Sequence, residues 1–134
     1  MSKHVVEFDQ LIRYDDGENG ITVDASIGFS DKRVSIKAKL DTGASICIFE
    51  RKYGEELGLD IESGLFQRVG TAVGSFNTYG FRVGLNVAGV ELDSLVYFAD
   101  DHAIRRNVLG RHGWVEMVRL GIVDYDRKLY ISRY

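Results

Sequence analysis

Apolar and polar residues alternate with a period of two along most of this chain, and this pattern constrains the fold more than any other feature. The alternation runs through residues 21–27 and again through residues 34–40, with a turn at residues 30–32 between them. Val, Ile, Tyr and Phe are frequent in such segments, and these residues favour half-buried strands. Glycine supplies the breaks, since the chain has 15 glycines and no proline. The pattern predicts an all-β, barrel-like fold.

The remaining strand-like segments follow the same rule. They are short, rich in β-branched and aromatic residues, and bounded by glycine or by clusters of small polar residues. Most are close enough in sequence to pair as hairpins, including one pair around Gly70 and Gly74 and another across Ala88 and Gly89. The further predicted strands are 4–14, two pieces within 65–79, 81–87, 90–98, and a closing hairpin within 122–131.

Two segments have helical rather than strand-like spacing. Residues 50–57 have the length of a short helix, with Gly58 at the position that commonly ends one. In residues 111–119, the apolar Trp114, Val115 and Val118 follow the i, i+1, i+4 spacing of a helix face. One or two short helices are therefore expected, too few to separate the strands of an α/β sheet.

Size and charge exclude several classes of protein. A chain of 134 residues has the size of one domain, so we expect a single domain over residues 1–134. A formal net charge of -3 gives no electrostatic reason to expect nucleic acid or an anionic membrane as a partner. No stretch approaches the length of a membrane span. The single cysteine and the lack of an apolar run at the N-terminus predict a cytoplasmic location.

Asp41 is the residue whose setting most suggests chemistry. It follows a predicted strand, and the apolar residues 46–49 come shortly after it. A carboxyl group held partly in low dielectric resists ionisation unless partners stabilise its charge, which suits acid–base work. Thr42 adds a hydroxyl group, and Gly43 lets backbone approach backbone closely. The simpler interpretation is a turn in which Asp41 caps its own loop, and the Asp-Thr-Gly triplet alone does not decide between them.

The order of parts along the chain resembles the retropepsin-like aspartic proteases. Residues 41–45, Asp-Thr-Gly-Ala-Ser, resemble the active-site loop of that family, and residues 107–111, Asn-Val-Leu-Gly-Arg, resemble its second signature. A glycine-containing hairpin lies between them, where the family has its flap. The resemblance implies a closed acid-protease barrel. The loop is Asp41, Thr42, Gly43, Ala44 and Ser45, and the flap is Val69, Gly70, Thr71, Ala72, Val73 and Gly74.

By this resemblance, the chain supplies half of an active site. Such proteases use two Asp side chains that share one proton, because like charges so close together cannot both ionise. This chain has one Asp-Thr-Gly, and no other Asp is followed by Thr or Ser and then Gly. The resemblance therefore implies a two-fold homodimer with one Asp41 from each copy, acting on a peptide or protein substrate. No cofactor is implied, and the histidines have no metal-ligand spacing with one another or with Cys47.

Other functions fit less well. A non-catalytic dimerisation or peptide-binding module with the same fold remains the main alternative, and Ser45 stands where retroviral enzymes often have an acidic residue. Residues 70–74 contain two glycines but lack the Lys of a phosphate-binding loop. Cys47 lies within an apolar run, which indicates a core residue more than a nucleophile. The sequence thus predicts an aspartic endopeptidase with Asp41 as its catalytic carboxylate.

Overall fold

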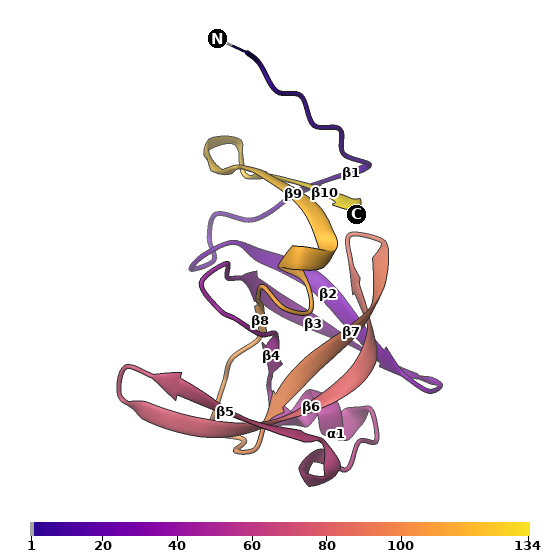
Figure 1. The fold of residues 1–134 in the computed structure, drawn as a ribbon, viewed down its shortest axis with the longest axis vertical. Coiled ribbons are helices and arrows are strands. Elements are labelled where there is room, and N and C mark those ends of the chain that lie inside the picture. The colour runs from indigo at the N-terminus through magenta and orange to yellow at the C-terminus, as the bar shows by residue number, and fades with distance from the viewer. Residues whose placement is uncertain (1) are drawn as a thin grey trace.

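The computed structural model describes residues 2–134 as a mostly β protein with one short α-helix (Figure 1). The helix α1 is Arg51–Glu56, and three single turns of 3-10 helix are η1 Ile61–Ser63, η2 Val115–Met117 and η3 Asp124–Asp126. The strands are β1 Gln10–Arg13, β2 Thr22–Phe29, β3 Lys32–Leu40, β4 Ile48–Phe49, β5 Leu65–Thr71, β6 Gly74–Val87, β7 Val90–Ala99, β8 Val108–Leu109, β9 Val118–Val123 and β10 Lys128–Arg133.

The strands form two sheets. The larger has the order β2-β3-β8-β4-β7-β6-β5, and β2 pairs with β6 as well, so that the pairings return to their starting strand. The smaller sheet has the order β1-β10-β9 and joins the two ends of the chain. In Figure 1 it lies at one end of the molecule, while the β5–β6 hairpin projects at the other. The site described below lies in the larger sheet.

The predicted hairpins are present, and their turns have the chemistry that tight turns need. β2 pairs with β3 from Thr22↔Lys39 to Phe29↔Lys32. β6 pairs with β7 down to Val87↔Val90, leaving only Ala88 and Gly89 in the turn. Both turn residues have positive φ, 54° and 82°, which matches the twist of the strands they join. Short turns of this kind set the register, and with it the face on which each side chain lies.

The core is built from the inward faces of these strands. Ile27, Leu85, Val96 and Leu109 are fully buried, and they come from four different strands. Trp114 is also fully buried. Burial of these large apolar side chains is the main force that holds the sheets together. None of the helices within residues 2–134 is long and apolar enough to span a bilayer.

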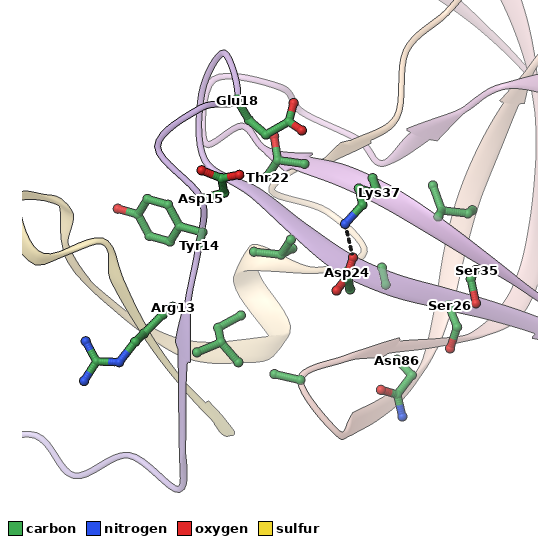
Figure 2. A pocket seen from close by; sticks show the side chains of 15 residues that line it. Arg13, Tyr14, Asp15, Glu18, Thr22, Asp24, Ser26, Ser35, Lys37 and Asn86 are labelled. Atoms are coloured by element: carbon green, nitrogen blue, oxygen red, sulfur yellow. Dashed lines mark hydrogen bonds and ion pairs between the residues drawn. The ribbon is translucent and has the colours of Figure 1, made fainter.

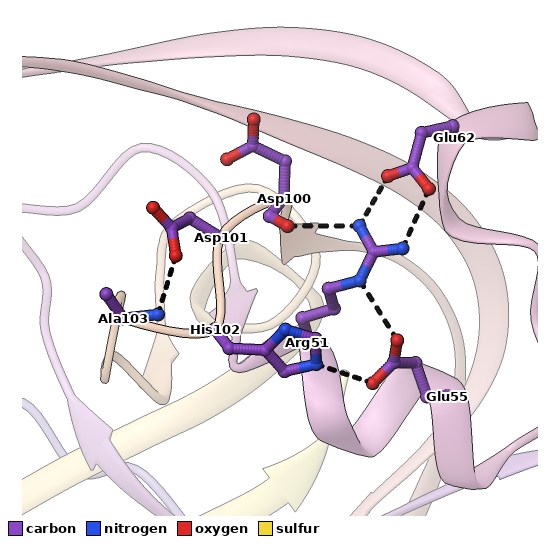
Figure 3. Close-up of polar contacts among 7 residues, drawn as sticks. All are labelled: Arg51, Glu55, Glu62, Asp100, Asp101, His102 and Ala103. Atoms are coloured by element: carbon purple, nitrogen blue, oxygen red, sulfur yellow. Dashed lines mark hydrogen bonds and ion pairs between the residues drawn. The ribbon is translucent and has the colours of Figure 1, made fainter.

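Helix α1 packs closely against the sheet because Gly54 has no side chain, and Arg51 holds the helix there. A Cβ on Gly54 would lie 2.6 Å from Cδ1 of Ile61 and 3.0 Å from the Phe98 ring, so glycine permits this close packing. The Arg51 guanidinium pairs with Glu55 and Glu62, and it donates a hydrogen bond of 3.0 Å to the carbonyl oxygen of Asp100 (Figure 3). Arg51 thereby ties the helix to η1 and to the loop that follows β7.

The predicted helix over residues 111–119 is wrong. Only η2, Val115–Met117, is helical, and β9 begins directly after it at Val118. Gly113 has φ +102° and Trp114 has φ -146°, neither of which continues a helix. The spacing of Trp114, Val115 and Val118 reflects burial in a tight turn and a strand, since Val118 pairs with Arg133.

The first predicted strand is shorter than residues 4–14. β1 comprises only Gln10–Arg13, and Gln10 lies opposite Ile131 of β10. One residue earlier, the Asp9 amide donates to the Ser132 hydroxyl, at 2.6 Å, in place of a backbone carbonyl. β10 ends at Arg133, so residues 4–7 have no strand to pair with. A strand pattern without a partner strand does not form a strand.

Candidate active site

Asp41 directly follows β3, at the start of a tight loop. Its amide donates a 3.0 Å hydrogen bond to the carbonyl of Leu109, which fixes the loop where β3 runs parallel to β8. Its Oδ1 accepts a 3.0 Å hydrogen bond from the Gly43 amide, and its carbonyl accepts one of 3.1 Å from Ala44. Asp41 therefore caps its own turn, and its side chain remains half-exposed. Capping and availability for chemistry are compatible here.

A second segment, residues 107–112, holds the loop in place through backbone contacts. The amides of Arg111 and His112 donate to the carbonyls of Ala44 and Ser45, both at 2.9 Å. Gly110 passes so close that a Cβ there would lie 2.2 Å from the Ile46 carbonyl oxygen. Only glycine lets two backbones approach this closely. The resemblance to a second signature at residues 107–111 thus corresponds to a direct physical contact with the loop.

Cys47 is part of this support and is not a reactive group exposed beside the loop. It is completely buried, and its Sγ accepts a 3.4 Å hydrogen bond from the Gly110 amide. Burial raises the pKa of the Cys47 thiol to about 11, because a thiolate would lose its hydration. A thiol with so high a pKa is a poor nucleophile at neutral pH. Cys47 is a small core residue beneath the loop, as the sequence indicated.

The loop faces a pocket of about 550 Å³ whose other wall is the β5–β6 hairpin. The lining from the loop side includes Asp41, Gly43, Ala44 and Ser45, and Val69 and Gly70 contribute from the hairpin. Six predicted site residues are therefore brought together around one hollow, although they are distant in sequence. A substrate in this pocket would contact both the carboxylate and strand β5 of the hairpin.

The other predicted residues lie outside the lining. Thr42 is exposed on the loop, and the flap residues Thr71, Ala72, Val73 and Gly74 form the hairpin tip. Val73 is 98% exposed, and a Cβ on Gly74 would meet nothing within 4 Å. The tip thus projects into solvent, while residues 67–70 of β5, just before the tip, form the wall of the pocket.

Several lining residues were missed by sequence reasoning. Arg68 lies in the middle of β5, and Arg106 and His112 flank the second signature. One signal was available for Arg106, because Arg105 and Arg106 directly precede residues 107–111. No signal linked Arg68 to Asp41, since their place in one pocket depends on how the hairpin packs relative to the loop.

A larger hollow of about 830 Å³ lies between β2, β3 and the segment that follows β1 (Figure 2). The most prominent polar contact there is the exposed ion pair of Lys37 and Asp24, at 2.7 Å. None of the predicted site residues lines this hollow. An exposed ion pair of this kind contributes little to stability. The pocket beside Asp41 is therefore the better candidate for an active site.

Comparison with known families agrees with this geometry. A family model described as aspartyl protease, of retropepsin-like type, matches residues 23–112. This chain belongs to that family. The match contains the Asp41 loop, the β5–β6 hairpin and the supporting segment 107–112, so it contains every part of the site described above. No curated protein matches the chain. The smaller β1-β10-β9 sheet of this aspartyl protease family member lies outside the matched residues.

Proposed function

We propose that this chain is an aspartic endopeptidase in which Asp41 is the catalytic carboxylate. The observation that carries the proposal is the pocket that Asp41 shares with residues 67–70 of the β5–β6 hairpin, within a chain of the aspartyl protease family. Asp41 is half-exposed there and lies in the chain's single Asp-Thr-Gly. In this proposal the ring of strand pairings is the closed acid-protease barrel, and the β5–β6 hairpin is the flap.

The proposed active unit is a two-fold homodimer with one Asp41 from each copy. Two carboxyl groups that share one proton can act as base and acid at the same time. The ionised Asp41 takes a proton from a water molecule, whose oxygen attacks the carbonyl carbon of the scissile bond. The protonated Asp41 donates a hydrogen bond to the carbonyl oxygen. Transfer of a proton to the peptide nitrogen then allows the C–N bond to break.

The support for a dimer is the openness of the loop. Thr42, Gly43 and Ser45 are exposed beside the half-exposed Asp41, so a second loop has room to meet the first. An isologous interface brings the same residue of each copy to the axis, which is what a symmetric pair of carboxylates requires. In this arrangement Thr42 braces the two loops, and Gly43 and Ser45 face the substrate.

The dimer is tested by mixing active and inactive subunits. At constant total concentration, an equal mixture of wild-type and Asp41→Asn chains should retain about a quarter of the wild-type activity, because random pairing leaves that share as wild-type dimers. Sedimentation should show a dimer at the assay concentration, and peptide hydrolysis gives the activity. Retention of half the activity would mean that each chain works alone, and the proposed dyad would then be wrong.

The proposed flap should be more mobile than the strands around Asp41. Its turn residues Ala72 and Val73 are exposed, and substrate must enter beneath the hairpin. We expect the amides of residues 70–75 to exchange hydrogen at least tenfold faster than those of β3, and to slow when a peptide-mimicking inhibitor binds. Hydrogen-exchange mass spectrometry measures both. Equal protection of the two segments, unchanged by inhibitor, would argue against gating by this hairpin.

A further inference from the structure

The residues that line the pocket beside Asp41 have a net positive charge, whereas the chain as a whole has a net negative charge. Among the residues that line it, Asp41 is the only acidic one, whereas two are arginines, Arg68 and Arg106. The third basic residue, His112, already has a carboxylate partner, because its Nδ1 lies 3.0 Å from Oε2 of Glu116. Arg68 and Arg106 are therefore the groups that set the charge of the pocket, in a chain whose net charge is -3.

Arg106 is held in place by the loop that carries it. Its guanidinium lies 6.0 Å from the ring centre of Phe76, on the flap hairpin, a weakly favourable cation–π arrangement. Directly after it, the Asn107 side chain accepts from the Glu50 amide at 3.0 Å and donates to Oε2 of Glu50 at 2.6 Å. The amide of Asp100 bonds to the carbonyl of Asn77 at 3.0 Å. The backbone next to Arg106 is thus held in place before any ligand arrives.

The start of the same loop is fixed as well. Arg51 holds the carbonyl of Asp100, and His102 contacts Glu55 at 2.7 Å (Figure 3). The amide of Ile104 closes a turn onto the carbonyl of Asp101, at 3.0 Å. A binding group on a rigid loop loses less conformational freedom when it binds a ligand.

The two pocket arginines have no carboxylate of their own. Among residues 2–134, the ion pairs involve other basic residues, such as Arg33 with Glu91 and Arg127 with Asp16, and none involves Arg68 or Arg106. Arginine binds carboxylates through two parallel hydrogen bonds, and such charged pairs are about twice as strong as neutral hydrogen bonds. A guanidinium that lines a substrate pocket without an internal partner is available for a substrate carboxylate.

We propose that the pocket selects peptides with an acidic side chain, Glu or Asp, that binds Arg106, with Arg68 as a second cationic contact on the flap side. This inference rests on the proposed protease function. Ile46, Ile48 and Val69 also line the pocket and suit the methylene groups of Glu, so Glu is preferred to Asp. Two-fold symmetry gives the dimer two such pockets, so acidic residues are favoured at equivalent positions on both sides of the scissile bond.

The test compares peptides that differ in one side chain. Each position within four residues of the scissile bond is varied among Glu, Gln, Leu and Lys, and kcat/KM is measured by mass spectrometry for each peptide. We expect Glu to exceed Gln by about tenfold at one position on each side, and the ratio to shrink in high salt. Arg106→Gln should bring the ratio close to one, Arg68→Gln should lower it less, and Arg106→Glu should invert it in favour of Lys.

Arg105→Gln is the matched control, because Arg105 is adjacent and exposed but does not line the pocket. It should keep the wild-type ratio. If wild-type cleaves peptides without favouring Glu, or if Arg105→Gln and Arg106→Gln change the ratio equally, this inference is wrong while the protease function stands.

Binding to the Asp41→Asn chain separates the two ideas further. Fluorescence anisotropy with labelled Glu and Gln peptides measures selection without cleavage. Tighter binding of the Glu peptide that depends on Arg106, together with no cleavage by the wild-type chain, would support the acidic subsite and overturn the protease function. Absence of both cleavage and selective binding would overturn both.

Discussion

The Asp41→Asn chain should cleave peptides at least about a thousandfold more slowly than wild-type, because it can neither accept the proton of the attacking water nor share one with its partner. The fold should survive. Oδ1 of Asp41 accepts a hydrogen bond from the Gly43 amide, and the side-chain oxygen of Asn can accept the same bond. Initial rates on a peptide library give the activity, and thermal unfolding tests the fold.

Asp31→Asn is the matched control for loss of one negative charge. Asp31 is exposed in the turn between β2 and β3, away from the pocket, so its variant should keep wild-type activity. Cleavage by a pure Asp41→Asn sample at a rate comparable with wild-type would remove Asp41 from the mechanism.

Gly110→Ala should destabilise the protein by about 3 kcal/mol or more, which is large for a change of one methyl group. The added Cβ would lie 2.2 Å from the carbonyl oxygen of Ile46 and 2.9 Å from that of Ala44. Both obstacles are backbone atoms, so no side-chain rotation relieves the clash. The segment carrying Gly110 must move away from the Asp41 loop, and the loop loses its support. Urea unfolding measures the change, and activity should fall with it.

Gly70→Ala separates this clash from a general effect of losing glycine. A Cβ on Gly70 would meet nothing within 4 Å, so the free energy of unfolding should change by less than about 0.5 kcal/mol. Equal unfolding midpoints for the two variants would mean that the approach of residues 44–46 to Gly110 does not constrain the fold.

Local pattern was enough to predict most of the hairpins and the single α-helix. Period-two alternation predicted β2 and β3, and Gly58 ended α1 in the expected position, with φ +81°. Each of these features is decided within a few residues, by backbone preferences and by the faces that side chains must present. Where a local pattern was compatible with two structures, as in residues 111–119, the helix it indicated was wrong, because Val118 found a strand partner in β10.

The candidate site, too, could be predicted only in part from the sequence. The sequence predicted the Asp41 loop, a hairpin and residues 107–111 in that order, because each is a contiguous segment. The placement of Arg68 and Arg106 around Asp41 was decided only by the tertiary structure. It depends on the parallel pairing of β3 with β8, on the hairpin forming the other wall of the pocket, and on the approach of Gly110 to Ile46. These contacts join residues far apart in sequence, and no short-range periodicity records them. The chain's own sequence thus specified the carboxylate and its loop, whereas the charge around that carboxylate arose from long-range packing.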